Sequence, residues 1–181
     1  MKIIFFGTQG SGKSTQAQLA AEALTLPYFE TGQLLRDQSK ENDDLAKEIK
    51  ENLDKGHLVP DEITISILRE NLQKKSSVAG YILDGYPRNF AQYNALDTDI
   101  DLVIHVKVAD EEAIKRLINR ARADDKPEAL QKRLEIYHRE TEPLLAKFKE
   151  REILKEVDGE RPIEDIHKDI LKIIKSYKKY Q

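Results

Sequence analysis

The first residues with a recognisable chemistry form a glycine-rich loop near the N-terminus. The stretch Gly7-Thr-Gln-Gly-Ser-Gly-Lys13-Ser14 fits the pattern G-x-x-x-x-G-K-[ST], which cradles nucleotide phosphates in backbone N–H groups. Its glycines permit the positive φ angles that turn those groups inward, and a following helix would direct its positive dipole end at the same anion. Lys13 should then reach the β- and γ-phosphates, and the Ser14 hydroxyl should ligate Mg²⁺. The loop predicts nucleotide binding but not the reaction, because GTPases, motor ATPases and small-molecule kinases share it.

A second chemical signal comes from the arginines. The chain has ten, and five of them fall between residues 116 and 139. A guanidinium is a planar fork of donors suited to phosphate oxygens. Arg116 and Arg120 are four residues apart and would share one face of a helix. Arg88 follows a glycine and a proline that should end a strand tightly and direct the arginine over the strand ends. Taken alone, the cluster could equally be a charged, solvated helix face.

Composition limits the classes of protein that the chain can be. At 181 residues it should form one domain that buries roughly 70% of the surface of the unfolded chain. Lysine and arginine number 30 against 33 aspartates and glutamates, and the net charge of −3 argues against nucleic-acid or anionic-membrane partners. The absence of cysteine excludes disulfides, thiol nucleophiles and cysteine-bound zinc. The apolar run Ile3 to Phe6 is too short for a signal peptide or a membrane span, so we expect a cytoplasmic protein.

Strand and helix patterns alternate along the chain and must position these residues. Short apolar runs predict strands over 2–6, 27–30, 81–84, 101–108 and 153–157. Helical spacing predicts helices over 13–24, 31–55 (as short polar helices), a stretch after Pro60, 110–121, 127–149 and a last segment from Ile163 to Tyr177. Pro143 should kink or split the helix over 127–149. His105 alternates within its strand and is expected in the core or at its rim.

Alternating strands and helices predict an α/β fold with a parallel sheet and helices on both faces. In such folds ligands bind at the carboxyl ends of the strands. The residues that should carry the chemistry are therefore those of Gly7–Ser14, Thr31–Arg36, Asp84–Arg88 and the 116–139 region.

Three further stretches follow the loop in order: Thr31-Gly-Gln-Leu-Leu-Arg36, Gly56-His-Leu-Val-Pro-Asp-Glu62 and Asp84-Gly-Tyr-Pro-Arg-Asn89. With the loop they resemble the nucleoside monophosphate kinases, most closely the adenylate kinase family, over essentially the whole chain. The resemblance implies a three-layer αβα P-loop NTPase fold with a five-stranded parallel sheet. It also implies a core made of 1–29, 60–121 and 127–181, a small helical NMP-binding insertion at 30–59, and a short lid at about 122–126.

The resemblance implies Mg²⁺-dependent transfer of the ATP γ-phosphoryl group to AMP, giving two ADP. On the acceptor side, Thr31 and the backbone of His57, Leu58 and Val59 would line the AMP base pocket. Gly85, Tyr86 and Pro87 would also bind AMP. Arg36 and Arg88 would clamp the AMP α-phosphate, and Gln92 would read the adenine edge. Asp84 would hold Mg²⁺ with Ser14, usually through water. A capping or turn aspartate is the alternative for Asp84, and a solvated charge is the alternative for Arg36 and Arg88.

On the donor side, the resemblance implies that the loop residues Gly10, Ser11, Gly12, Lys13, Ser14 and Thr15 bind ATP. Arg116 would flank the ATP adenine, Arg120 would contact the ATP phosphates, and the backbone near Gly159 and Arg161 would touch the adenine. Arg122 and Arg133 would bridge both nucleotides at the transferring group. Lys13, Arg88, Arg120, Arg122 and Arg133 are thus the expected catalytic residues. Asp124 and Asp125 would orient the lid arginines, and Arg139 is expected to be a surface charge.

Two departures and two alternatives accompany the resemblance. Gln33 stands where the family usually has aspartate, which removes a charge near the acceptor site. Only four residues separate Arg122 from Pro127, so the lid should be short and without zinc. A UMP/CMP kinase is the nearest alternative, and Thr31 with Gln92 favours AMP. A regulatory ATP-binding module without turnover would leave the arginines unexplained. No exposed apolar stripe is evident, so we expect a monomer.

Overall fold

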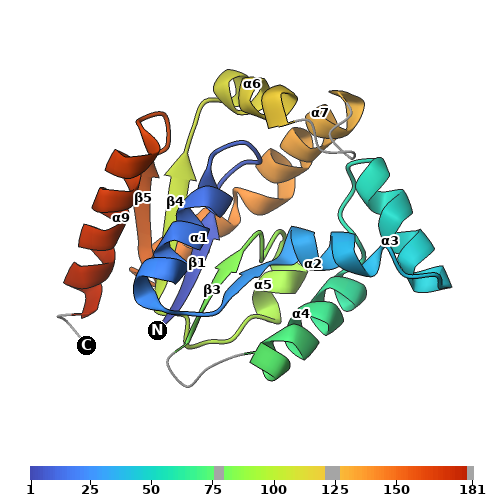
Figure 1. Cartoon of the computed structure of the whole chain (residues 1–181), viewed down its shortest axis with the longest axis horizontal. Helices are drawn as coiled ribbons and strands as arrows, with labels where there is room; N and C mark the ends of the chain where they lie inside the picture. Colours follow the sequence, from blue (N-terminus) through green and yellow to red (C-terminus); the bar gives the residue numbers. More distant parts are fainter. Residues whose placement is uncertain (76–79, 121–126, 179–181) are drawn as a thin grey trace.

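Five parallel strands form the centre of the computed structural model, which describes residues 1–75, 80–120 and 127–178 (Figure 1). The strands are β1 (Lys2–Phe6), β2 (Tyr28–Glu30), β3 (Tyr81–Asp84), β4 (Leu102–Lys107) and β5 (Leu154–Asp158). They lie in the order β2-β3-β1-β4-β5, and each neighbouring pair is parallel. The predicted α/β fold with a five-stranded parallel sheet is confirmed, and each strand lies within one residue of the predicted positions.

Strand β1 lies at the middle of the sheet because it is apolar on both faces. Its residues Ile3 to Phe6 are at most 3% exposed, as expected for a strand that is covered on both sides. In the register, Phe5 faces Asp84 of β3 on one side and Ile104 of β4 on the other. Strands β3 and β4 lie on opposite sides of β1, so the order in which the chain adds strands reverses at β1. Ligand sites in such sheets lie beyond the carboxyl ends of the strands at that point.

Helices cover the sheet on two faces (Figure 1). On one face, α1 (Lys13–Leu24) and α9 (Ile163–Lys178) pack their alanines and isoleucines against Ile3 and Phe5. On the other face, a second apolar cluster joins Ile4 and Phe6 to the helices that follow β2 and β4. This arrangement gives the three layers that the sequence predicts.

The remaining helices follow β2, β3 and β4 along the chain. They are α2 (Thr31–Gln38), α3 (Asp44–Asp54), α4 (Asp61–Lys75), α5 (Phe90–Asn94), α6 (Asp110–Arg120), α7 (Pro127–Ile136), the π-helical turn η1 (Tyr137–Thr141) and α8 (Leu144–Glu150). Pro143 separates η1 from α8, so the predicted split of the long helix is confirmed. The short helix α5 was not predicted; the Asn89 side chain caps it by accepting a hydrogen bond from the Gln92 N–H at 2.9 Å.

The segment between β2 and α4 has a small apolar cluster of its own. Leu35, Ile49 and Val59 are buried against Ile67 of α4. In Figure 1 the helices α2 and α3 of this segment lie on the side of the molecule away from α9. The predicted lid at 122–126 lies outside the described residues. Within the described ranges, no helix is both long and apolar enough to cross a membrane.

Candidate functional site

The glycine-rich loop joins β1 to α1 and lies at the centre of the site. Gly10 and Gly12 have φ angles of 84° and 88°, in the left-handed region that favours glycine. A side chain on Gly10 would overlap the carbonyl oxygen of Ala113 in α6, so the loop packs backbone against backbone there. Helix α1 begins at Lys13, and its first N–H groups therefore face the space that the loop encloses.

Lys13 and Asp84 bring opposite charges together at the ends of β1 and β3. The Lys13 Nζ lies 3.9 Å from Asp84 Oδ1, and the Asp84 side chain is 1% exposed. Asp84 Oδ2 accepts a hydrogen bond from the Tyr28 hydroxyl at 3.1 Å, whereas Oδ1 is buried and accepts none from the described residues. Burial, the Asp84 charge and the Glu30 charge raise the pKa of Tyr28, so the hydroxyl stays protonated and donates.

Ser14 and Asp84 form a small oxygen donor set for a cation. The Tyr28 hydroxyl contacts Asp84, and Ser14 lies near enough to the same hydroxyl to lower its pKa slightly, so the three side chains lie close together. Hydroxyl and carboxylate oxygens suit Mg²⁺, which usually takes one or two protein ligands and completes its shell with water and phosphate. The buried, unsatisfied Oδ1 of Asp84 fits such a role.

Two cavities meet at Lys13 and Ser14. The first is named here the Arg88 cavity and, with the open solvent at its mouth, encloses about 1150 Å³. Among the residues that line it are Lys13, Ser14, Thr31, Arg36, His57, Leu58, Val59, Asp84, Gly85, Tyr86, Pro87, Arg88, Gln92 and Arg133. The second, the Arg116 cavity, encloses about 1120 Å³ counted in the same way. Its lining includes Gly10, Ser11, Gly12, Lys13, Ser14, Thr15, Arg116, Gly159 and Arg161. Every described residue predicted for the acceptor side therefore lines one cavity. Every residue predicted for the donor side whose side chain the structure describes lines the other.

Arg36 and Arg88 converge above Gly32 in the Arg88 cavity. A side-chain carbon built on Gly32 would lie 3.3 Å from Arg36 Nη1 and 3.8 Å from Arg88 Nη2. The two guanidiniums therefore face a common small space, with no side chain between them at Gly32. Planar donor groups converging in this way suit a phosphate dianion.

Arg88 is a partly buried cation without a carboxylate contact among the described residues. Its Nε donates to the Gly85 carbonyl at 2.9 Å. Burial lowers the pKa of its guanidinium; Arg133 and Arg36 lower it further, while Asp84 opposes them. Arginine nevertheless remains protonated at neutral pH. The Arg88 guanidinium thus carries its positive charge in a partly desolvated environment, and an anion bound beside it would offset that cost.

Arg36, in contrast, contacts a carboxylate. Its Nη2 donates to Glu30 Oε1 at 2.6 Å, and its Nε donates to Gln33 Oε1 at 3.2 Å. Gln33 is uncharged, so the negative charge that contacts Arg36 comes from Glu30 at the end of β2 instead. Sequence analysis missed Glu30, although its place at the carboxyl end of a strand was a usable signal.

Arg133 and Arg116 are held from other elements. Arg133 Nη2 donates to the Leu53 carbonyl at 2.9 Å and so links α7 to α3. Arg116 donates from Nε to Glu112 at 2.8 Å and from Nη1 to the Gly159 carbonyl at 2.9 Å. Arg116 and the turn after β5 therefore lie together.

Several predicted residues cannot be placed in this way, and others were missed. The side chain of Arg120 and the whole of Arg122, Asp124 and Asp125 lie outside the described residues. Arg139 pairs with Glu135 and Glu140 on the surface, as predicted. Thr141 was missed: its hydroxyl donates to the Arg88 carbonyl at 2.6 Å and ties η1 to the site. Asp61, Asn89 and Tyr137 were also missed as neighbours of the cavity.

Comparison with known proteins gives a consistent result. The family model described as adenylate kinase matches residues 5–153. An adenylate kinase from Bifidobacterium longum is 42% identical over 177 residues, which cover 92% of this chain and 95% of that protein. Adenylate kinase 1 from Synechocystis sp. is 39% identical over 180 residues and 96% of each chain. An adenylate kinase from Lachnospira eligens is 34% identical over 212 positions, covering 96% of this chain and all of that protein. The alignments with the Synechocystis and Lachnospira eligens proteins cover the same share of this chain but are 180 and 212 positions long. The Lachnospira eligens protein therefore has residues that are absent from this chain.

Proposed function

Since the chain belongs to the adenylate kinase family and transfers the γ-phosphoryl group of ATP to AMP to give two ADP, we propose that ATP occupies the Arg116 cavity and AMP the Arg88 cavity. The observation that carries this assignment is that Lys13 and Ser14 line both cavities. A phosphoryl group bound beside Lys13 and Ser14 is within reach of a ligand in either cavity. Direct transfer requires such a junction, because both nucleotides must be bound at once.

The proposed mechanism needs positive charge and positioning rather than an acid or a base. The AMP phosphate already presents an ionised oxygen as nucleophile. Lys13, Arg88 and Arg133 oppose the repulsion between the two phosphate groups, and Arg120 and Arg122 are proposed to join them. Holding the two reactants together supplies up to about 7–11 kcal/mol of barrier lowering.

Mg²⁺ bound with the nucleotide would neutralise charge on the β- and γ-phosphate oxygens. Ser14 would hold it directly and Asp84 through water. Tyr28 orients the Asp84 carboxylate through its hydrogen bond to Oδ2, and Oδ1 accepts no hydrogen bond from the described residues. Chelating Mg²⁺ should abolish ADP formation, whereas adding it back should restore the activity.

Exclusion of water is the other requirement, because an exposed γ-phosphate would be hydrolysed. We propose that the segment 30–59 and the lid at about 122–126 close over the nucleotides. A cytoplasmic monomer is proposed as the working form, and light scattering would test the monomer.

A complex with a bisubstrate analogue, two adenosines joined through phosphates, tests these assignments together. The expected result is one adenosine in each cavity, with the linking phosphates against Lys13, Arg88 and Arg133. Adenosines outside the cavities, or arginines turned to solvent, would contradict the proposal.

Assays with AMP, CMP and UMP as acceptors test the acceptor assignment. Thr31, Gln92 and the 57–59 backbone favour AMP, so AMP should be the best of the three. ATP binding without ADP formation on adding AMP would instead indicate the regulatory module that the sequence left open.

A further inference from the structure

Three side chains form a closed hydrogen-bonded ring beside the Arg88 cavity. Asp61 lies at the first residue of α4, and Asn89 and Gln92 lie at the start of α5. Asn89 Nδ2 donates to both carboxylate oxygens of Asp61, at 2.9 and 3.1 Å. Gln92 Nε2 donates to Asp61 Oδ1 at 2.8 Å, and Asn89 Oδ1 accepts from the Gln92 N–H at 2.9 Å. The ring therefore links the beginnings of two helices that are far apart in sequence.

The Gln92 amide at the edge of this ring has only one favourable orientation. Its Oε1 accepts a hydrogen bond from the Arg88 N–H at 2.8 Å, while its Nε2 faces Asp61. A backbone N–H can only donate, and an ionised carboxylate can only accept. Turning the amide over would place donor against donor and acceptor against acceptor. Because Gln92 is 2% exposed, water cannot compensate for such an arrangement.

The fixed amide still has one N–H and one lone pair that these partners do not use. Gln92 lines the Arg88 cavity, so these two groups are available to a ligand in a fixed order. A 6-aminopurine presents an amino donor and an adjacent ring acceptor at its edge, whereas a 6-oxopurine presents an oxygen acceptor and a ring N–H. The two bases have nearly the same shape but the opposite hydrogen-bonding order.

We propose that Asp61 is a positioning residue for acceptor specificity. It holds the Gln92 amide in the order that accepts a 6-aminopurine monophosphate and rejects a 6-oxopurine monophosphate. This proposal rests on the proposed role of Gln92 in binding the acceptor base. Asp61 acts only through Gln92, because the described contacts of its carboxylate are to Gln92 and Asn89.

The test compares AMP with IMP, its 6-oxo counterpart, as phosphoryl acceptors. In the Asp61→Asn variant the new side chain can donate as well as accept, so only the Arg88 N–H still holds the Gln92 amide in its orientation. The ratio of kcat/KM for AMP to kcat/KM for IMP should fall about tenfold, the size expected for losing a hydrogen bond to a charged group. The KM for ATP should stay unchanged. An unchanged AMP-to-IMP ratio in this variant would overturn the proposal.

The neighbouring Glu62→Gln variant is the matched control. It removes a carboxylate from the same first turn of α4, where Glu62 is exposed and contacts neither Asn89 nor Gln92 in the described structure. Its AMP-to-IMP ratio should equal that of the unmodified protein. A fall as large as that of Asp61→Asn would assign the effect to the helix terminus and overturn the proposal.

Two further variants keep the test decisive. If Asp61→Asn does not fold, Asn89→Ser carries the comparison, since serine can still cap α5 but cannot donate to Asp61 as asparagine does. The ratio should then fall about threefold, as expected for a weaker restraint on the carboxylate; an unchanged ratio would overturn the proposal.

The Gln92→Leu variant tests the role of Gln92 separately from the role of Asp61. If it leaves the AMP-to-IMP ratio unchanged, the role proposed for Gln92 is wrong as well; if it removes the preference while Asp61→Asn does not, only the role of Asp61 is wrong.

Discussion

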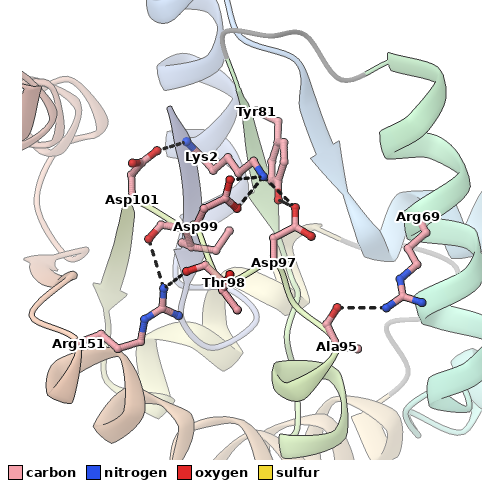
Figure 2. A network of polar contacts seen from close by, with 10 residues as sticks. Lys2, Arg69, Tyr81, Ala95, Asp97, Thr98, Asp99, Asp101 and Arg151 are labelled. Carbon is pink, nitrogen blue, oxygen red and sulfur yellow. Dashed lines mark hydrogen bonds and ion pairs between the residues drawn. The ribbon is translucent and has the colours of Figure 1, made fainter. Parts of the chain in front are cut away.

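Lys2 at the amino end of the sheet and Arg88 at the carboxyl end have opposite surroundings. At the amino end, Lys2 Nζ lies 3.0 Å from Asp97 and 2.7 Å from Asp99, and the Lys2 backbone N–H donates to Asp101 at 2.6 Å (Figure 2). At the carboxyl end, Arg88 contacts no carboxylate among the described residues. Compensated charges hold strands and loops together, whereas an uncompensated charge is available to a ligand. The same residue types thus serve stability at one end and binding at the other.

The amino-end network also fastens the loop between α5 and β4. Figure 2 shows Arg151 reaching the Thr98 carbonyl and Arg69 reaching the Ala95 carbonyl, at 2.9 and 3.5 Å. The Tyr81 hydroxyl donates to Asp97 at 3.2 Å. These contacts come from three different elements, and none of them lines either cavity. Changes here should therefore affect unfolding and leave catalysis alone.

The largest expected effect lies at the carboxyl end, in Arg88→Ala. Loss of a preorganised cation should lower kcat/KM for AMP about 10²- to 10³-fold. The melting temperature should not fall, because the variant removes a charge that burial disfavours. Arg139→Ala, which removes an arginine with surface pairs only, is the control and should keep full activity. An unchanged kcat/KM in Arg88→Ala would remove Arg88 from the site.

The second expected effect lies at the amino end, in Lys2→Met. The free energy of unfolding in a denaturant titration should fall by about 1 kcal/mol, because the ion pairs are partly exposed and the remaining aspartates repel one another. Both kcat and KM should match those of the unmodified protein. A loss of activity without a loss of stability would erase the contrast between the two ends.

A smaller effect should appear in the pH dependence of stability. The hydrogen bond from Lys2 holds the pKa of Asp99 below its ordinary value, although partial burial opposes it. A carboxylate with a lowered folded-state pKa stabilises the protein above its ordinary value of roughly 3.9, and this contribution is lost as the pH falls through the lowered value. Asp99→Asn should therefore be less stable than the unmodified protein at pH 7, by less than about 1 kcal/mol. At pH 2 the difference should shrink, and denaturant titrations at both pH values would show it. A difference that grows on acidification would contradict the assignment.

The smallest expected effect is a gain, in Glu30→Gln. The Glu30 carboxylate competes with the AMP phosphate for Arg36, so its neutralisation should lower the KM for AMP about two- to threefold, as expected for one partly solvated charge. Asp44→Asn, on the exposed start of α3, is the control and should leave this KM unchanged. A raised KM for AMP would mean that Glu30 orients Arg36 rather than competing for it.

The parts that were predictable from sequence are those with local causes. The loop, the strand before it and the helix after it follow from neighbouring residues, and so does the break at Pro143. The placement of His105 in the core is confirmed too, since it is 6% exposed and contacts Glu156 and Tyr137. Helix α5 was missed because its five residues are too short to show a period.

The unpredicted parts of the site depend on contacts between distant segments. Asp61 meets Gln92 across 31 residues, and Thr141 meets Arg88 across 53. No sequence pattern links these positions, because their proximity arises only when α4, α5 and η1 pack at one edge of the sheet. Glu30 differs from them because it lies only six residues before Arg36. Secondary-structure propensities nevertheless do not predict which carboxylate an arginine side chain will contact.

The shared wall formed by Lys13 and Ser14 has a consequence for the direction of the reaction. Two ADP molecules entering from opposite sides would meet the same charges, in the same places, as ATP and AMP do. A change to either residue should then slow synthesis and breakdown of ADP equally, because a catalyst alters both rates by one factor. The relative amounts of the three nucleotides, rather than any asymmetry of the protein, would decide which way the phosphoryl group moves.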